Sequence, residues 1–479
     1  MSRLQAAIAV TRFGMGARAG DIEAASSDPR GWLEQQIRPQ AAVMAGVDGM
    51  DQLQSTGDVF AARMRDVAMS GPASPGGATE AQRIIQQRIQ REAREGLQRE
   101  GEARARFGAA TPDAFAERWA RFWSNHFTVA ARNGEMIGLV GPYEREAIRP
   151  NVFSSFSRLL GQAVFHPAML IYLDAARSIG PSTEIGRRRG AGLNENLARE
   201  ILELHTLGVG SGYSQDDVIA FANALTGWTV NDPRMARLIA AGRGPARRAS
   251  APPAGVEPGA AIFIDRLHEP GARVVLGRSY ADVGREQAAL ILEDLAVHPA
   301  SARHIAIKLA RHFVADRPPE SAIGRLERVF LETRGDLSAL ARAVVHLDEA
   351  WQSEQKKLKT PDELLVSAMR AAGPQAVFGA AGGMRTVYTS LAQQPFSAPS
   401  PAGWPDQAEA WSGGDALMKR IEWADAAARR IARGASPVVF LNQALGDLAS
   451  ARTRQAVLRA ESAEQGFTLA LMSPEFQRR

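Results

Sequence analysis

Residues 192–208 read Gly-Leu-Asn-Glu-Asn-Leu-Ala-Arg-Glu-Ile-Leu-Glu-Leu-His-Thr-Leu-Gly, and this stretch indicates the fold class. An α-helix turns by about 100° per residue, so residues three and four apart share one face. The apolar side chains recur at that spacing: Leu193, Leu197, Ile201, Leu204 and Leu207. Gly208 follows the last of them, as is common where a helix ends. The stretch predicts an amphipathic helix packed against other helices.

Most of the chain repeats this pattern. Asp28-Pro29, Thr111-Pro112-Asp113 and Ser214 each combine a capping residue with a following helical segment. Residues 80–106, rich in Gln, Arg and Glu, predict one long solvated helix. We therefore expect a mainly α protein, with one large, irregular multi-helix domain over residues 1–479.

Two segments depart from the helical pattern. Residues 231–260 are dominated by Pro, Gly, Arg and Ala without periodicity, and predict an irregular insertion or loop. Residues 261–276 contain two β-branched runs on either side of His268-Glu269-Pro270-Gly271, which is typical of a turn. This second segment predicts one small β-hairpin.

Composition excludes several classes of protein. The chain has no cysteine, so disulfides, thiolate metal sites and cysteine nucleophiles are absent. Its 57 basic and 52 acidic residues are intermixed, so the net charge of +5 does not indicate a nucleic-acid surface. No apolar run is long enough to cross a bilayer, and no secretory signal is recognisable. As written, the sequence predicts a cytoplasmic protein, or a periplasmic or secreted one if it is truncated.

Carboxylates follow the edge of the apolar face in residues 192–208. Asn196, Glu200 and Glu203 form a row, and Glu200 lies within the edge itself. A carboxylate there needs a partner, either an arginine or a metal ion. Carboxylates one turn apart can share a cation, and His205 follows closely, although it projects almost opposite Glu203. Carboxylate and imidazole donors would favour zinc, iron or manganese.

Two further histidines are candidates for acid–base chemistry. His126 shares a helical face with aromatic residues in Trp119-Ala-Arg-Phe-Trp-Ser-Asn-His126, and His166 precedes Pro167. A hydrogen-bonded core histidine is the simpler reading of each. Their occurrence near Glu200 makes Glu200, His126 and His166 the candidate catalytic residues, with Glu200, Glu203 and His205 as candidate metal ligands.

A ligand cleft could be lined by Asn196 and by tryptophans in loops, Trp228 and Trp404, although such tryptophans more often fill a core. The sequence contains no Gly-x-Ser-x-Gly elbow, no phosphate-binding loop, no His-Glu-x-x-His and no dinucleotide fingerprint. The common hydrolase, nucleotidase, zinc protease and dehydrogenase classes therefore have no support.

Several longer motifs together resemble a known family. They are Arg12-Phe13-Gly14-x-Gly16, Phe122–Phe127, Arg145–Asn151, His166–Asp174, Asn194–Gly208, Leu225–Trp228, Lys359-Thr360-Pro361 and Gly403-Trp404-Pro405. Across essentially the whole chain, the sequence resembles the bacterial family called domain of unknown function 1800 (DUF1800). Glu269 after His268, where the family more often has Asp, and Ala175-Ala176, where Asn is common, depart from the family pattern.

The resemblance implies no established activity. It implies that relatives are often secreted and are encoded beside a second family resembling sulfatases and alkaline phosphatases, which is therefore a possible protein partner. Two hypotheses remain. One is a metal-dependent or acid–base enzyme, a hydrolase or oxidoreductase of unknown substrate. The other is a non-catalytic helical scaffold that binds a partner through residues 80–106 and 231–260, with Glu200 and Glu203 paired to arginines such as Arg145 or Arg149.

Overall fold

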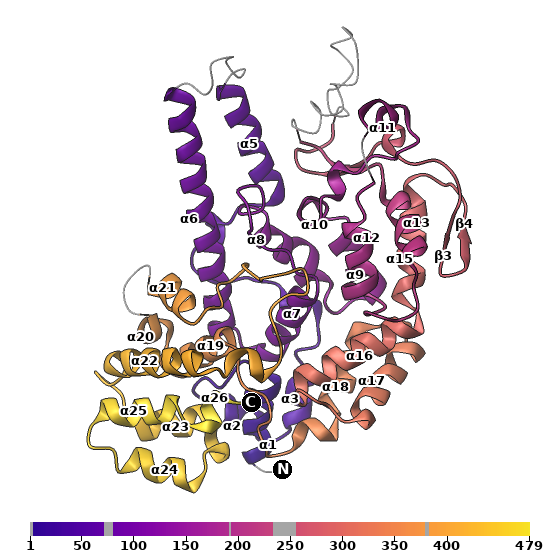
Figure 1. The fold of residues 1–479 in the computed structure, drawn as a ribbon. Helices are drawn as coiled ribbons and strands as arrows, with labels where there is room; N and C mark the ends of the chain where they lie inside the picture. Colours follow the sequence, from indigo (N-terminus) through magenta and orange to yellow (C-terminus); the bar gives the residue numbers. More distant parts are fainter. Residues whose placement is uncertain (1–2, 71–79, 191–192, 233–254, 379–382) are drawn as a thin grey trace.

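The computed structural model describes residues 3–70, 80–190, 193–232, 255–378 and 383–479. Within these ranges the protein is mainly helical and has two small two-stranded antiparallel sheets (Figure 1), which confirms the predicted fold class. The predicted insertion at 231–260 lies largely outside the described residues. No helix in the described ranges has the length and apolar character that a bilayer crossing requires.

The elements of the first half are α1 Arg3–Ile8, η1 Ala9–Phe13, α2 Asp21–Ala25, α3 Pro29–Glu34, α4 Pro39–Ala42, η2 Met50–Gln52, α5 Thr56–Ser70, α6 Glu80–Ala110, α7 Ala114–His126, α8 Val140–Tyr143, η3 Glu144–Ile148, η4 Arg149–Asn151, α9 Phe156–Val164, α10 Pro167–Tyr172, η5 Ala175–Arg177, α11 Glu184–Arg189, α12 Asn196–Glu200, η6 Ile201–His205, α13 Gln215–Leu225 and β1 Trp228–Val230. Those of the second half are β2 Ala261–Phe263, η7 Asp265–Leu267, β3 Arg273–Val275, β4 Arg278–Tyr280, α15 Arg285–Ala296, α16 Pro299–Phe313, α17 Glu320–Glu332, α18 Leu337–Val345, η8 Asp348–Trp351, α19 Pro361–Ala372, α20 Pro374–Phe378, α21 Gly383–Ser390, η9 Ala408–Trp411, α22 Gly414–Ile431, α23 Pro437–Leu445, η10 Gly446–Leu448, α24 Ala451–Leu458, α25 Ala463–Leu471 and α26 Pro474–Gln477.

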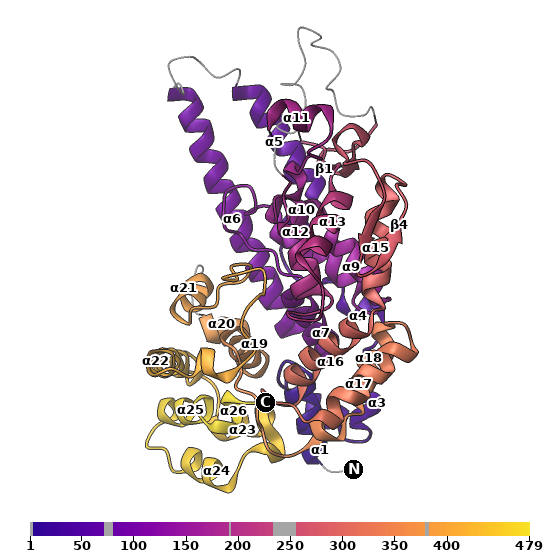
Figure 2. The ribbon, with the colours of Figure 1, turned by 45° about the vertical axis from the view of Figure 1, so that its right-hand side comes forward.

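The helices are arranged around α7. In Figures 1 and 2, the C-terminal helices α19–α26 lie on one side of α7 and α15–α18 on the other, while α5 and α6 project together as an arm. One continuous apolar core joins residues from both ends of the chain, from Ala6 to Phe476. This continuity supports the prediction of one domain over residues 1–479, which stays a prediction.

The strands do not pair as the sequence analysis expects. Residues 261–276 do contain β2 and β3, but these two strands do not form a hairpin with each other. Strand β2 pairs with β1, placing Trp228 opposite Phe263, and β3 pairs with β4, placing Arg273 opposite Tyr280. The hairpin turn is Leu276-Gly277, where both residues have positive φ. A two-residue turn of this kind suits the twist of paired strands, so β3 pairs with the strand that follows it.

The stretch at 192–208 is helical, but it is not one regular α-helix. Helix α12 passes at Ile201 into η6, a π turn in which hydrogen bonds reach five residues back. The wider turn changes which side chains face inward. Leu202 and His205 are fully buried, whereas Leu204 is only half-buried.

Candidate active site

Helix α7 positions the centre of the site. It is buried along its length, and Trp119 and Trp123 are fully inaccessible. The Trp119 indole donates to the Val152 carbonyl at 2.7 Å, which anchors the helix to the segment after η4. Because its apolar side chains are enclosed on all sides, α7 is a rigid support. Its last turn carries Ser124, Asn125 and His126, which all line one cavity.

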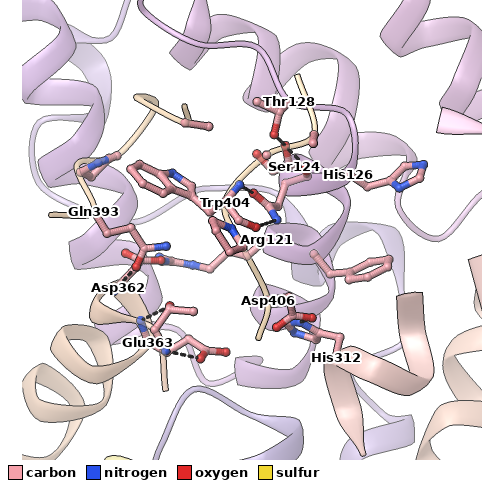
Figure 3. Close-up of a pocket in the computed structure, with 18 of the residues that line it drawn as sticks. Arg121, Ser124, His126, Thr128, His312, Asp362, Glu363, Gln393, Trp404 and Asp406 are labelled. Carbon is pink, nitrogen blue, oxygen red and sulfur yellow. Dashed lines mark hydrogen bonds and ion pairs between the residues drawn. The ribbon is translucent and has the colours of Figure 1, made fainter. Parts of the chain in front are cut away.

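This cavity has a volume of about 520 Å³ (Figure 3). Its other walls come mainly from α16, from the first turn of α19 and from the loop 393–407. Single residues of other segments also line it, namely Met15, Arg104 of α6, Thr128 and Val129 after α7, Glu144 of η3 and Leu204 of η6. A volume of this size accommodates a small organic molecule. The site therefore combines segments from more than half the length of the chain.

His126 and His205 each hold the main chain of the other. His126 Nε2 lies 3.0 Å from the His205 carbonyl oxygen, and His205 Nδ1 lies 3.0 Å from the His126 carbonyl oxygen. A ring nitrogen that faces a carbonyl carries the proton, so both rings donate in these bonds. The remaining nitrogen of His126, Nδ1, then accepts a hydrogen bond from Lys308 Nζ at 2.8 Å.

The histidines around this point are neutral at neutral pH. Burial, followed by the Lys308 charge, holds the pKa of His126 well below its ordinary value. The same two causes lower the pKa of His205 to about 3 and that of His304 to about 4. His304 Nε2 donates to the Leu204 carbonyl at 3.1 Å. Positive charge on this wall therefore belongs to other side chains.

Those side chains are Lys308 and Arg311, one turn apart on α16. Both are half-buried and line the cavity. Burial, together with the nearby Arg311 charge, lowers the pKa of Lys308 to about 8, against the opposing effect of Asp406. Arg311 Nε is buried and has no hydrogen-bond partner in the part of the chain that the structure describes. Within the described ranges, neither cation has a carboxylate within ion-pair distance, so this wall carries unneutralised positive charge.

His312, also on α16, forms a dyad with Asp406. His312 Nδ1 lies 3.2 Å from Asp406 Oδ2, and Figure 3 shows the two side chains facing each other. Lys357 binds Asp406 as well, with its Nζ 3.3 Å from Oδ1. Burial raises the pKa of Asp406, but His312, Lys357 and Arg479 outweigh burial and hold it well below the ordinary value. Burial lowers the pKa of His312 to about 4 despite the adjacent carboxylate.

The opposite wall of the cavity carries charges that neutralise one another. The cation–anion pairs are Arg104 with Glu144 at 2.9 Å, Arg121 with Asp362 at 2.5 Å, and Arg118 with Glu363. Buried ions require partners of this kind, because an isolated charge loses its hydration without compensation. These arginines therefore stabilise the fold through buried ion pairs.

The loop over the cavity is held by Asn125. The Asn125 side chain donates to the Trp404 carbonyl at 3.0 Å and accepts from the Trp404 amide at 2.7 Å. Gly403 has φ +86°, and a β-carbon there would lie 2.4 Å from the Asn125 carbonyl oxygen. Glycine is required here both by the left-handed backbone and by this close approach.

Only some of the residues predicted for the site lie at the cavity. His126 and Trp404 line the cavity, and the His205 carbonyl accepts a hydrogen bond from the His126 ring. His166 is elsewhere: it caps α10 through Nδ1, which accepts from the Ala168 amide at 3.1 Å. Trp228 packs against Phe165 with ring centroids 4.3 Å apart, and does not line the cavity.

The carboxylate row also lies outside the cavity. Asn196 is exposed at the start of α12. Glu200 is half-buried, and burial together with the charge of Glu203 raises its pKa. Glu203 lies 3.6 Å from Arg199. The arginines suggested as partners are bound elsewhere, since Arg145 pairs with Glu100, and Arg149 with Glu117 and Glu144.

No metal site emerges from the described part of the chain. It contains no group of three or more His, Asp or Glu side chains placed to hold a metal ion. In particular, His205 uses Nδ1 for the His126 carbonyl, and Glu203 is close to Arg199, so the proposed trio with Glu200 is not assembled. The described residues therefore do not provide the set of ligands that the sequence suggested for zinc, iron or manganese.

The sequence did not single out Lys308, Arg311 and Asp406, which line the cavity. A signal was available, because His304, Lys308 and Arg311 recur at helical spacing in the segment 299–313. The chain is also poor in lysine, which makes a lysine inside an amphipathic helix conspicuous. Asp406 follows Trp404-Pro405 and carried no signal for its contact with His312, which lies 94 residues away.

Comparison with known protein families identifies one relationship. The family model described as "Protein of unknown function (DUF1800)" matches residues 8–478. The chain belongs to the DUF1800 family. Comparisons with curated proteins and with solved structures found no match. Of the motifs on which the resemblance was based, Phe122–Phe127, Asn194–Gly208, Lys359-Thr360-Pro361 and Gly403-Trp404-Pro405 each contribute to the cavity wall.

Proposed function

We propose that this DUF1800 protein is an acid–base enzyme that acts on a small molecule bound in the cavity beside His126 and Lys308. The observation that carries the proposal is the 2.8 Å contact between Lys308 Nζ and His126 Nδ1 at the cavity wall. His126 is itself fixed by its bond to the His205 carbonyl. This chain of contacts holds one amine nitrogen in a defined position next to the space for a ligand.

The protonation of Lys308 suits proton transfer. An ordinary lysine has a pKa near 10.4 and is almost entirely protonated at neutral pH. With its pKa lowered to about 8, Lys308 has both a protonated and a neutral fraction near pH 7–8. A group with a pKa near the working pH can accept a proton in one step and return it in another. Here Lys308 is the proton-transferring group and His126 its positioning residue.

The acid–base alternative is favoured over the metal-dependent one because the described residues offer an oriented lysine and no three-donor cluster. It is favoured over the scaffold because several of the motifs that carry the family resemblance, at 122–127, 194–208, 359–361 and 403–405, contribute to the wall of one cavity. The protein partner implied by that resemblance stays a prediction.

The first test is the pH dependence of Lys308 reactivity. The chain has five lysines, Lys308, Lys356, Lys357, Lys359 and Lys419, so each can be followed by peptide mass spectrometry after brief acetylation. We expect acetylation of Lys308 to rise with a midpoint near pH 8, with Lys419, whose side chain is 39% exposed, as the internal control. A midpoint near pH 10, or no acetylation at any pH, would contradict the proposal.

The second test looks for turnover. Wild-type protein and the Lys308→Met variant are incubated with a small-molecule extract, and consumed compounds are identified by mass spectrometry. Lys356→Met, which changes an exposed lysine, is the matched control. We expect at least one compound to be consumed by the wild type and the control but not by Lys308→Met. Equal consumption by all three proteins would exclude Lys308 as the proton-transferring group.

A further inference from the structure

We propose that the ligand of this cavity is a small organic oxyanion, whose carboxylate or phosphate group binds between Lys308 and Arg311. The inference names the substrate class of the acid–base site and rests on the function proposed above. It is carried by the distribution of charge on the cavity walls, which differs sharply between its two sides.

On the side formed by α6, α7 and α19, every lining arginine has a carboxylate partner. Arg104 contacts Glu144 at 2.9 Å, Arg121 contacts Asp362 at 2.5 Å, and Arg118 contacts Glu363. These pairs leave no cation on that side available to a ligand.

On the side formed by α16, the cations have no such partners. Among the described residues, Lys308 hydrogen-bonds only the neutral His126 ring, and Arg311 makes no side-chain hydrogen bond or ion pair. Residues at i and i+3 lie on the same face of a helix, so the two positive groups can act on one ligand. Asp406 does not neutralise them by contact, because it is held by His312 and Lys357.

An oxyanion would satisfy this wall. A partly buried guanidinium without acceptors has lost hydration without gaining hydrogen bonds. A carboxylate or phosphate supplies several acceptor oxygens, and the planar guanidinium binds two of them at once. Lys308 can donate to the same group, because only one of the three protons of its ammonium group is directed to His126. The neutral imidazoles of His126 and His304 add no competing charge.

The remainder of the cavity fits an organic body attached to that anion. Its apolar surface comes from residues on α7, in the segment just after it, on η6 and in the 393–407 loop, and includes Phe122, Val129, Leu204, Phe396 and Trp404. The volume of about 520 Å³ suits a compact molecule rather than a polymer.

Calorimetric titration tests the proposal with matched probes. Benzoate and phenyl phosphate are the carboxylate and phosphate probes, and benzamide is the neutral analogue of similar size. We expect at least one oxyanion to bind about tenfold more tightly than benzamide, which is the size of effect expected for a charge-assisted hydrogen bond. Preference between the two anions identifies the headgroup. Equal affinity of all three probes, or no binding, would overturn the inference.

Variants locate the site. Arg311→Gln should weaken oxyanion binding about tenfold, and Arg311→Lys should retain part of the affinity. Arg317→Gln, which changes an exposed arginine further along the chain, is the control and should bind as the wild type does. No described residue forms a hydrogen bond or ion pair with the Arg311 side chain, so its variants should unfold at the wild-type temperature. Unchanged binding by Arg311→Gln would place the anion elsewhere.

A protection experiment separates this inference from the proposed function. A bound oxyanion should slow acetylation of Lys308 without affecting Lys419. If Lys308 titrates near pH 8 but no oxyanion binds, the substrate class is wrong and the acid–base function stands. If oxyanions bind and protect Lys308 but its acetylation midpoint lies near pH 10, the anion site stands and the proton-transfer function fails.

Discussion

Acidification should destabilise the folded protein through its buried histidines. The folded protein keeps His205, His304 and His312 neutral, with pKa values of about 3, 4 and 4, chiefly because of burial. In the unfolded chain a histidine titrates near pH 6.5. The unfolded state therefore binds protons first as the pH falls. These histidines therefore do not lower the free energy of unfolding above about pH 6.5. Below it, the free energy of unfolding falls until the pH reaches the histidine pKa values of the folded protein.

The magnitude follows for His205, which is fully buried. A pH of 5 is about 1.5 units below the pKa of a histidine in the unfolded chain, and each pH unit corresponds to about 1.36 kcal/mol of unfolding free energy. Protonation of this one residue in the unfolded chain therefore lowers the free energy of unfolding by about 2 kcal/mol at pH 5. The folded pKa of about 3 lies far enough below pH 5 to have almost no influence on this figure.

The assay is urea unfolding, followed by circular dichroism at pH 5 and pH 7.5, of the wild type and His205→Asn. Asparagine keeps an N–H that can reach the His126 carbonyl but does not titrate. We expect the loss of unfolding free energy on acidification to be about 2 kcal/mol smaller in the variant. His346→Asn, which removes an exposed histidine, is the matched control. An identical loss in His205→Asn and the wild type would refute the reasoning.

Two further predictions concern the supports of the cavity. Glu117→Gln removes the fully buried carboxylate that binds Arg149 at 2.7 Å and Arg121 at 2.5 Å, and should lower the free energy of unfolding by roughly 3–5 kcal/mol. Asp425→Asn, in an exposed pair, should change it by less than about 1 kcal/mol, and an equal effect of the two variants in urea unfolding would contradict the assignment. Gly403→Ala should loosen the loop 393–407 and increase its amide hydrogen exchange, because a β-carbon there meets the Asn125 carbonyl. Gly413→Ala is the control, because its added carbon meets open space, and it should leave hydrogen exchange in that loop unchanged. Unaltered exchange in Gly403→Ala would show that the close approach of Gly403 to Asn125 does not hold the loop.

Local signals in the sequence were sufficient for much of the fold. The cap at Ser214 is a capping box that opens α13, and the polar segment from Glu80 is the long helix α6. These features depend on residues a few positions apart, so their physical causes are visible in one stretch of sequence.

Strand pairing was not visible in this way. The β-branched runs at 261–276 are strands, but their partners depend on a tight turn at Leu276-Gly277 and on β1, which precedes a long intervening segment. The π turn at η6 was equally hidden. A regular helix places Leu204 inward, whereas the wider turn brings in His205, whose ring then bonds the end of α7.

By itself, then, the sequence determined the helical class, several helix starts and the family, and it named His126 and Trp404, which line the cavity. Only the tertiary structure decided that Glu200, Glu203 and His166 lie elsewhere, and that Lys308, Arg311 and Asp406 share a cavity with His126. The physical reason is that helix formation depends on neighbours within a turn or two. The charge state and partners of a side chain depend on which distant segments pack around it. Lys308 and His126 are 182 residues apart in sequence, and only packing brings their nitrogens to 2.8 Å.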